Sequence, residues 1–459
     1  MRRLVQGALE RIVHHIETLP QQKAADVEGA LELARSVREP MPEQGTSYDQ
    51  LLDLIFDRLA PKSFNTAGPG YLAYIPGGGL FESALADFIG ETVNRYVGVW
   101  LAAPGLAQIE ANVVRWLCEI VKYPDGASGF LTSGGSLANF GAIVTARRAL
   151  LPENFLAGTL YTTDQVHHSV QKAAMLAGFP ASAVRLVPVD SEYRMRPDEL
   201  EKLVEQDRKA GKTPFFVIGN AGTTNTGAVD DLSALADISS RQKLWLHVDG
   251  AYGGFFMLTE RGRAVLRGIE RSDSVTLDPH KGMFLPYGTG SLLVRDGAAL
   301  ERAHHAEADY LPTLPDAPDM VDFSKVSPEL SRPFRGIRVW LPVKLHGIGT
   351  FRRNLDEKLD LTLWATAELR KIPGMEIVAE PQLSIVAFRL KRPGLDEEAL
   401  NQLNRAFING VNRRNRVHLS GTTLEGRFVL RICVLSFRTH MERMREGLDD
   451  VRAAAAELS

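Results

Sequence analysis

Apolar residues near the start of the chain recur at the spacing of a helix. They fall three or four positions apart and are Leu4, Val5, Ala8, Leu9, Ile12, Val13, Ile16 and Leu19. Pro20 follows them, and proline ends a helix because it lacks a backbone N–H. The pattern predicts an amphipathic helix, followed by helical stretches through Leu33 and over residues 51–59. Such an arm packs either on a partner subunit or on its own domain, and the pattern alone favours neither.

The stretch from about residue 105 to 295 alternates between helical and strand patterns. Residues 109–121 are predicted to form a helix, and Pro197, Asp198 and Glu199 begin another, because proline suits the first helical position and acids its positive end. Short buried strands are predicted at 160–163, 184–189, 215–219, 244–248, 274–277 and 290–294. This alternation is typical of an α/β domain with a mainly parallel sheet.

The remainder of the chain reads as a loop followed by a smaller unit. Five prolines fall between residues 310 and 333, which indicates a long loop of the kind that often forms a lid or part of a site. A helix is predicted over 339–369, then a strand at 384–390, a helix at 397–412, a hairpin of 417–419 with 427–435, and a helix at 441–458. We therefore expect an N-terminal helical arm (1–70), a large α/β domain (71–345) and a small α+β C-terminal domain (346–459).

Composition narrows the class of partner. The 459 residues are 44% hydrophobic and 24% charged, with a net charge of −3, so neither nucleic acid nor an anionic membrane is favoured. The first residues lack the apolar run of a signal peptide, and no stretch approaches the roughly 18 uninterrupted apolar residues of a membrane span. Cys118 and Cys433 are expected to be core residues, and such low cysteine use suits the cytoplasm.

A glycine-rich segment lies between a short apolar stretch and a predicted helix. It runs from Thr132 to Ser136 and contains Gly134 and Gly135. The glycines let the backbone approach an anion, Ser136 adds a hydroxyl, and the helix start supplies free N–H groups. The segment is therefore either a phosphate cradle or a tight strand-to-helix turn.

Several reactive side chains follow predicted strands. His167, Thr224, Asp249 and Lys281 each lie just past one, and parallel sheets place their sites at these strand ends. In isolation, His167 and Thr224 are also explained as a helix start and a turn.

Asp249 and Lys281 together point to pyridoxal phosphate chemistry. A buried carboxylate needs a cationic partner, and the pyridine N–H of the cofactor is one, while a nearby Arg or His is another. A lysine at a strand exit is either solvated or desolvated for imine chemistry, and His280 beside Lys281 could shield the cofactor or touch its phosphate. A zinc site of His247, Asp249 and His280 is disfavoured because no HExxH or paired-cysteine spacing is present, and no metal is expected.

In their order along the chain, these segments resemble the pyridoxal-phosphate-dependent group II amino-acid decarboxylases, which include aromatic-L-amino-acid, tyrosine, histidine and glutamate decarboxylases. The resemblance covers about residues 68–353 and is closest to the aromatic branch over 69–76 and 100–110. It rests on the segments Ser133-Gly134-Gly135-Ser136-Leu137-Ala138-Asn139, His167, Gly222-Thr223-Thr224, His247-Val248-Asp249-Gly250-Ala251-Tyr252 and Asp278-Pro279-His280-Lys281.

The resemblance implies a fold-type I homodimer whose active sites lie at the dimer interface. It implies that Lys281 forms the Schiff base with the cofactor, that Asp249 pairs with the pyridine nitrogen, and that His167 stacks on the ring. The remaining cofactor contacts that it implies are Ala251 beneath the ring, Gly134, Gly135, Ser136, His280 and Ser274 at the phosphate, and Thr224 near the cofactor phenolate or the substrate carboxylate. We expect Tyr74, Ile75 and Trp100 to line a substrate pocket or else to belong to the core, and Gly77–Gly79 to leave space or flexibility there.

One position departs from the family pattern. In the aromatic decarboxylases a loop tyrosine returns a proton to the reacting carbon, and counting back from residues 330–335 places Phe323 at that position. In plant relatives this substitution accompanies release of an aldehyde, ammonia and peroxide. We therefore expect decarboxylation of an L-amino acid, with an aromatic side chain favoured, and keep an aldehyde-forming oxidative deaminase as the rival. Tyr310 or a water is the alternative proton source, and a catalytically silent binding protein is opposed by the intact Lys281 and Asp249.

Overall fold

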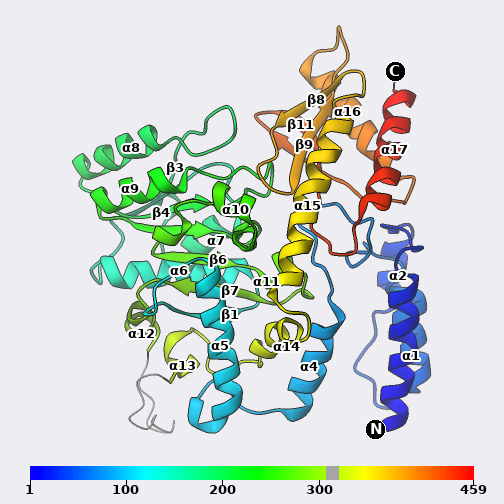
Figure 1. Ribbon diagram of the computed structural model, residues 1–459, viewed down its shortest axis with the longest axis horizontal. Helices are drawn as coiled ribbons and strands as arrows, with labels where there is room; N and C mark the ends of the chain where they lie inside the picture. The colour runs from blue at the N-terminus through cyan, green and yellow to red at the C-terminus, as the bar shows by residue number, and fades with distance from the viewer. Residues whose placement is uncertain (306–319, 459) are drawn as a thin grey trace. The chain divides into compact units, whose positions relative to one another are not determined.

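The computed structural model describes residues 1–305 and 320–458 (Figure 1). The chain divides into two compact units. One comprises Met1–Pro76, Leu361–Val378 and the chain from Ala387 onward, and the other comprises Gly77–Asp360 and Ala379–Val386. We call them the terminal unit and the central unit.

The central unit is built on a seven-stranded sheet of order β1-β7-β6-β5-β4-β2-β3. Its strands are β1 (Ser128–Thr132), β2 (Gly158–Thr162), β3 (Val184–Leu186), β4 (Thr213–Asn220), β5 (Trp245–Asp249), β6 (Ser274–Leu277) and β7 (Gly290–Val294). β7 runs antiparallel to both of its neighbours, and the pairs among β6, β5, β4, β2 and β3 are parallel. The predicted alternating, mainly parallel α/β domain is therefore confirmed.

Helices surround this sheet, and α6 is the one that contacts five of its strands, β1, β4, β5, β6 and β7. Its first turn follows the glycine-rich segment. The helices of the central unit are α4 (Phe81–Val93), α5 (Pro104–Ile120), α6 (Gly135–Leu150), α7 (Ser169–Leu176), α8 (Pro197–Lys209), α9 (Leu232–Gln242), α10 (Glu260–Val265), α11 (Pro279–Gly282), α12 (Ala298–His304), α13 (Phe323–Val326) and α14 (Gly336–His346). Short 3-10 turns are η2 (Trp100–Ala102), η3 (Ala181–Ala183), η4 (Gly254–Leu258) and η5 (Ile269–Arg271).

The single helix predicted over 339–369 is instead two helices, α14 and α15 (Ile348–Leu369). Gly347 separates them with φ 69° and ψ 148°. A positive φ with an extended ψ interrupts helical hydrogen bonding, and glycine adopts it without steric penalty. The apolar periodicity continues through the break, which is why the pattern did not reveal it.

Close packing explains Gly77 and Gly78, two of the three consecutive glycines at 77–79. A Cβ on Gly78 would lie 2.5 Å from the Cβ and the carbonyl oxygen of Phe284. A Cβ on Gly77 would lie 2.9 Å from the ring of Tyr287, and its backbone N–H donates to the Tyr287 hydroxyl at 3.4 Å. These glycines therefore allow two backbones to approach, rather than leaving open space.

The terminal unit begins with the predicted helical arm. It contains α1 (Arg2–Thr18), α2 (Ala30–Ser36), α3 (Tyr48–Asp53) and η1, a π-helical turn (Leu54–Leu59). None of the α1 residues is buried within the described part of the chain, and Leu4 and Leu9 are nearly half exposed. The apolar face of α1 is thus left largely uncovered.

A four-stranded sheet of order β10-β11-β9-β8 forms from the C-terminal part of the chain. Its strands are β8 (Met375–Ala379), β9 (Ile385–Leu390), β10 (Ser420–Leu424) and β11 (Arg427–Cys433), and α16 (Glu397–Asn412) and α17 (Met441–Glu457) accompany them. The first hairpin strand lies at 420–424 rather than 417–419, because the turn is formed by Glu425 and Gly426, both with positive φ, as two-residue hairpin turns require. β8 was not predicted.

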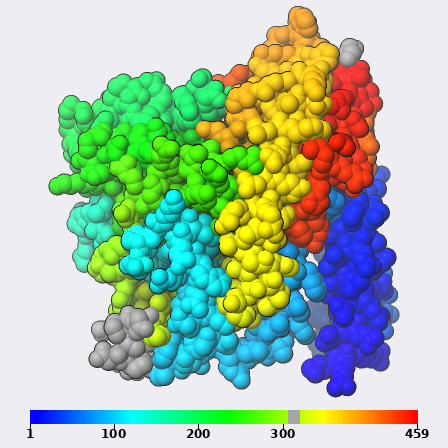
Figure 2. Space-filling model, in the orientation of Figure 1, coloured from blue at the N-terminus to red at the C-terminus, as the bar shows by residue number. Residues whose placement is uncertain are grey.

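The central unit exposes an apolar surface on α4. α14 packs against α4 and α5, and Figure 2 shows α5 (cyan) and α14 (yellow) beside each other at the surface. The exposed apolar residues of α4 recur at helical spacing and are Phe81, Leu85, Phe88, Ile89 and Val93. Cys118 and Cys433 are both buried, as predicted. Among the described residues, no helix is both long enough and apolar enough to cross a membrane.

Candidate functional site

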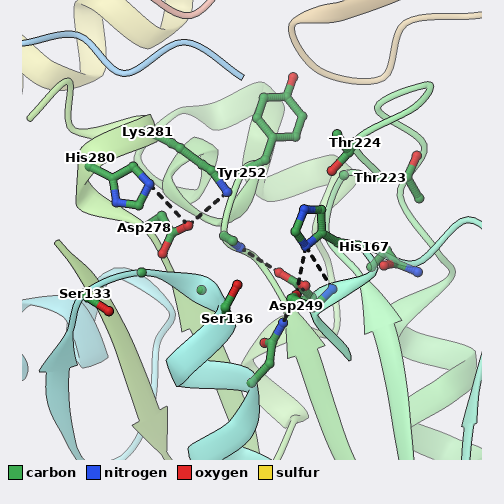
Figure 3. A pocket seen from close by; sticks show the side chains of 17 residues that line it. Ser133, Ser136, His167, Thr223, Thr224, Asp249, Tyr252, Asp278, His280 and Lys281 are labelled. Carbon is green, nitrogen blue, oxygen red and sulfur yellow. Dashed lines mark hydrogen bonds and ion pairs between the residues drawn. The ribbon is translucent and has the colours of Figure 1, made fainter. Parts of the chain in front are cut away.

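A cavity of about 270 Å³ lies in the central unit (Figure 3). It opens where β4, β5 and β6 end and where α6 and α11 begin. The lining residues come from the motifs predicted from the sequence and from side chains between them, and they are Ser133, Gly134, Gly135, Ser136, Asn139, His167, Ser169, Asn220, Gly222, Thr223, Thr224, Asp249, Ala251, Tyr252, Asp278, His280 and Lys281. The crevice expected at the carboxyl ends of the strands is therefore present.

The glycine-rich segment forms one wall of this cavity. β1 ends at Thr132, whose Oγ1 accepts the N–H of Gly134 at 3.1 Å, and α6 starts at Gly135. A Cβ on Gly135 would lie 3.2 Å from both Ala251 Cβ and Asp278 Oδ2, so a side chain would crowd the cavity. The first N–H groups of a sixteen-residue helix and its positive dipole end favour an anion here.

Asp249 lies at the end of β5 and is 9% exposed. Its Oδ2 accepts from Asn139 Nδ2 at 3.0 Å, and its Oδ1 accepts from the backbone N–H of Ala251 at 3.1 Å. Both of these donors are neutral. They orient the carboxylate without cancelling its charge, so the negative charge remains available to a cationic ligand in the cavity.

Lys281 lies in α11, which begins directly after Asp278. Its Nζ is 2.9 Å from Asp278 Oδ2. The other oxygen of this buried carboxylate, Oδ1, accepts no hydrogen bond from the residues that the structure describes. A single amine is thus positioned at the cavity beside a carboxylate that needs a further partner.

His280 lies on the same side of the cavity. Its Nδ1 donates to the carbonyl of Thr289 at 2.6 Å, because a carbonyl can only accept, and its Nε2 is 3.7 Å from Asp278 Oδ2. Burial lowers the pKa of His280 below its usual value, although Asp278 opposes the shift. A Cβ on Gly134 would lie 3.3 Å from His280 Cε1, so the ring adjoins the glycine-rich wall, as expected of a phosphate neighbour.

His167 faces these groups across the cavity, on the same side as Thr223 and Thr224, with Asp249 between the two sides (Figure 3). The segment that carries it connects β2 to α7. Burial lowers the pKa of His167, and the nearby Asp249 only partly offsets this. The imidazole is therefore neutral at physiological pH and offers a flat, uncharged face.

Some residues predicted from the sequence do not line the cavity. Ser274 is fully buried behind Asp249, where its hydroxyl is bonded by Trp245 Nε1 and His247 Nδ1, each at 2.8 Å, so the predicted phosphate contact is not supported. The signal was misleading because Ser274 begins β6 rather than ending it, and a parallel sheet presents only strand ends to its site.

Neither the three residues predicted for a substrate pocket nor Phe323, at the predicted position of the loop tyrosine, is among the residues that line the cavity. Trp100 begins η2, where its backbone N–H donates to Asp322 Oδ1 at 2.6 Å, and Phe323 is 1% exposed with the Arg332 guanidinium 4.9 Å from its ring centre. Tyr74 and Ile75 belong to the terminal unit. Their substrate roles stay predictions, and Tyr310 lies outside the described residues.

Three residues that line the cavity had no role predicted from the sequence, and they are Asn139, Asn220 and Asp278. Asn139 lies four residues after Gly135 and therefore one helical turn above the cradle, which was an available signal. Asn220 ends β4 directly opposite Asp249 in the parallel register.

The arrangement suits a phosphorylated aldehyde with a basic ring. The helix start and glycines accept a phosphate, Asp249 accepts a ring N–H, and Lys281 supplies an amine that condenses with an aldehyde. The unpartnered oxygen of Asp278 and the tight space at Gly135 mark this cavity as built for a ligand. Within residues 1–305 and 320–458, no three His, Cys, Asp or Glu side chains gather in a way that could hold a metal ion.

Comparison with known proteins places these motifs in context. Residues 31–391 match the model of the pyridoxal-dependent decarboxylase conserved domain. The chain is 34% identical over 461 residues to an aromatic-L-amino-acid decarboxylase of Bacillus atrophaeus, covering 100% of this chain and 96% of the relative. It is also 27% identical to a phenylacetaldehyde synthase of Arabidopsis thaliana, covering 93% and 90%.

Among solved structures, tryptophan decarboxylase of Catharanthus roseus in complex with L-tryptophan superimposes with a TM-score of 0.92. The match has 25% identity and covers 100% of this chain and 98% of the other. The predicted fold class is therefore confirmed.

Proposed function

This chain belongs to the family of pyridoxal-dependent decarboxylases, and we propose that it removes the α-carboxylate of an aromatic L-amino acid to give the amine and carbon dioxide. The observation that carries the proposal is that Lys281, Asp249 and the glycine-rich helix start all line the same cavity. The aromatic side chain is supported by the relatives, since the 34%-identical protein is an aromatic-L-amino-acid decarboxylase.

Pyridoxal phosphate is the cofactor of the family, and when bound it supplies an aldehyde that takes up amines and a protonated ring that accepts an electron pair. Gly134, Gly135 and Ser136 would hold its phosphate, and Asp249 its ring nitrogen.

Three residues of the cavity have different roles in this proposal, namely Asp249, Lys281 and His167. Asp249, held by neutral donors, presents a full negative charge toward a cationic ring nitrogen and keeps that proton in place. Lys281 supplies the amine that the substrate amine replaces. His167, neutral and flat, covers one side of the space above Asp249 and limits the access of water.

A panel of L-amino acids tests the substrate. We expect the purified holoenzyme to release carbon dioxide from L-tryptophan, L-tyrosine or L-phenylalanine at a kcat/KM at least about tenfold above that for L-glutamate or L-histidine. Lys281→Ala, which removes the amine, serves as the blank for every substrate. Release from L-glutamate alone would overturn the aromatic assignment while leaving the family intact.

The aldehyde-forming reaction is the second candidate. Phe323 favours it at the position predicted for the proton-donating tyrosine, and a phenylacetaldehyde synthase is among the relatives. In that reaction the amino acid and dioxygen give carbon dioxide, ammonia, hydrogen peroxide and an aldehyde, with water supplying the aldehyde oxygen. Dioxygen is the oxidant and is reduced to the peroxide.

Product analysis of Phe323→Tyr separates the two reactions. If position 323 selects the product, the variant raises the amine-to-peroxide ratio, because a phenol can return a proton and a phenyl ring cannot. Phe334→Tyr, which adds the same hydroxyl eleven residues away, is the matched control. An unchanged ratio in Phe323→Tyr removes this residue from product selection.

We also propose that the protein is a homodimer. The exposed apolar residues of α4 and of α1 recur at helical spacing, so each helix presents a continuous apolar face that needs a covering surface. Phe88 is the most exposed of the α4 set, at 54%. Light scattering should give twice the mass of the chain, and Phe88→Glu should lower it toward the monomer, whereas Leu395→Glu, at a similarly exposed leucine of the terminal unit, should not. A monomeric wild type would refute the proposal.

A further inference from the structure

A continuous group of buried polar side chains lies behind Asp249. It is contributed by β5, β6, α6 and the start of α7, and within it each neighbour is joined to the next by a hydrogen bond. Its members are Trp245, Ser274, His247, Thr276, Asn139, Ser169, His167 and Asp249. All except the half-buried His167 are buried, and Asn139 is 1% exposed.

Asn139 uses every hydrogen-bonding valence of its amide. Nδ2 donates to Asp249 Oδ2 at 3.0 Å and to Ser169 Oγ at 3.2 Å. Oδ1 accepts from Thr276 Oγ1 at 2.8 Å and lies 3.0 Å from His247 Nε2. A carboxylate can only accept, so the amide must turn its NH₂ toward Asp249 and its oxygen toward His247.

This orientation fixes the proton on His247. Because Asn139 Oδ1 can only accept, His247 Nε2 must carry the hydrogen, and burial lowers the pKa of His247 to about 4, so the ring is neutral and Nδ1 accepts. Ser274 therefore donates to Nδ1 at 2.8 Å and accepts from the Trp245 indole at 2.8 Å. The indole N–H of Trp245 can only donate. The hydrogen-bond directions required at Trp245 are therefore the same as those deduced from the Asp249 end.

Ser169 fixes the proton on His167, and the second N–H of Asn139 donates to the Ser169 hydroxyl. The Ser169 backbone N–H donates to His167 Nδ1 at 3.3 Å, so this nitrogen is an acceptor. The Ser169 hydroxyl then also donates to Nδ1 at 2.8 Å and accepts from Asn139. The proton of the neutral His167 ring is consequently on Nε2.

We propose that Asn139 is a positioning residue that orients the Asp249 carboxylate, holds the tautomer of His247 and, through the Ser169 hydroxyl, positions the ring of His167. The proposal rests on the proposed function only in assigning Asp249 to the ring nitrogen. One amide thereby acts on both sides of the cavity, since Asn139 donates directly to Asp249 and also to the Ser169 hydroxyl, which in turn donates to His167. Loss of that amide should loosen both together.

Replacement of Asn139 by leucine tests this, with Ser169→Ala to remove only the branch to His167. Asn404→Leu is the matched control, because Asn404 is likewise a fully buried helical asparagine whose amide is bonded to backbone atoms of Leu390 and Leu400. Three quantities are compared: the thermal midpoint, the dissociation constant of pyridoxal phosphate, and the imidazole ¹⁵N spectrum of cofactor-free protein labelled at histidine. The spectra are assigned with His167→Gln and His247→Gln.

We expect wild-type His247 and His167 to give the pattern of a neutral ring protonated at Nε2. Asn139→Leu should mix the tautomers of His247, shift the Nδ1 signal of His167 and raise the cofactor dissociation constant about tenfold or more, the effect of losing one hydrogen bond to a charged group. Ser169→Ala keeps the backbone N–H that donates to His167 Nδ1, so it should shift the Nδ1 signal of His167 without mixing its tautomers and leave the His247 signals unchanged. Asn404→Leu should lower the thermal midpoint but alter neither the histidine spectra nor the dissociation constant.

The proposal is overturned if Asn139→Leu lowers the thermal midpoint as Asn404→Leu does and leaves the histidine spectra unchanged. It is equally overturned if wild-type His247 or His167 proves to be protonated at Nδ1. Should Asn139→Leu fail to fold, the spectra of the wild type and of Ser169→Ala still decide. These spectra are recorded without cofactor, so a failure of the proposed function, seen as wild-type protein that binds no pyridoxal phosphate, is distinguishable from a failure of this inference.

Discussion

Two buried carboxylates border the same cavity and are held in opposite ways. Asp249 receives hydrogen bonds from a neutral amide and a backbone N–H, whereas Asp278 pairs with the charged amine of Lys281 through one oxygen. The first keeps its charge for a ligand. Asp278 instead uses its charge to pair with a residue that itself reacts. The electrostatic surroundings of Asp278 must therefore change whenever the amine of Lys281 becomes neutral. Both carboxylates lie at strand ends, so the different roles of Asp249 and Asp278 come from their different hydrogen-bond and ion-pair partners.

The largest difference between the two carboxylates should appear in catalysis. Asp249→Asn keeps the shape but removes the charge that stabilises a protonated ring nitrogen, and we expect kcat to fall by about 10²–10³. Asp278→Asn, the matched change, should alter kcat by less than about tenfold. Steady-state kinetics of both variants at saturating cofactor measure this, and equal losses would abolish the distinction.

Stability of the cofactor-free protein should reveal the ion pair of Asp278. Lys281→Met leaves a buried carboxylate without its cation, and since Lys281 is 23% exposed the cost should be about 3 kcal/mol in the free energy of unfolding, at the low end for a buried pair. The double variant Lys281→Met/Asp278→Asn should recover most of that loss. Denaturant titration of the wild type and the three variants completes the cycle, and a double variant no more stable than Lys281→Met would show that the pair is not the cause.

Acid should lower the free energy of unfolding, because the buried His247 ring behind Asp249 is neutral in the folded protein. Burial lowers the pKa of His247 from 6.5 to about 4, so between these values the unfolded chain binds more protons than the folded one. Stability is therefore fully present above pH 6.5 and falls as the pH drops toward 4, with about 2 kcal/mol lost from this residue at pH 5. His247→Gln should flatten the dependence of unfolding free energy on pH, and His346→Gln, at a surface histidine, should not. A slope unaffected by His247→Gln would contradict the assignment.

The smallest effect concerns cofactor capture. Asp278→Asn removes the anion that holds Lys281 as an ammonium and thereby favours the neutral amine, the form that condenses with an aldehyde. The rate of association with pyridoxal phosphate at pH 7 should rise about threefold to tenfold, followed by the change in visible absorbance after mixing. Association at the wild-type rate or slower would mean that Asp278 does not restrain the lysine.

Strand ends were where the sequence was most informative. Asp249 and Lys281 stand out because an ionisable side chain directly after a buried apolar run has few structural explanations, and the cavity contains both. Ser274 was assigned from the resemblance alone, and its place at the start of β6 removed it from the cavity.

Side chains whose partners come from distant segments could not be foreseen. The spacing from Gly135 placed Asn139 near the cradle, but its hydrogen-bond partners Asp249 and His247 lie more than a hundred positions later in the chain. The same holds for the helix break at Gly347, which lies inside an unbroken apolar period. The apolar pattern of a segment predicts which of its residues are buried. Which other segment those residues contact depends on the tertiary structure.

The cavity wall is encoded in one uninterrupted stretch of the chain, from Ser133 to Lys281, and every part of that stretch belongs to the central unit. Changes outside this stretch leave every lining residue in place, while Thr132 and Thr289 support the wall from just beyond its two ends. A substitution at either flank, such as one at Phe323, can therefore be tested while the whole set of cavity-lining side chains stays unchanged.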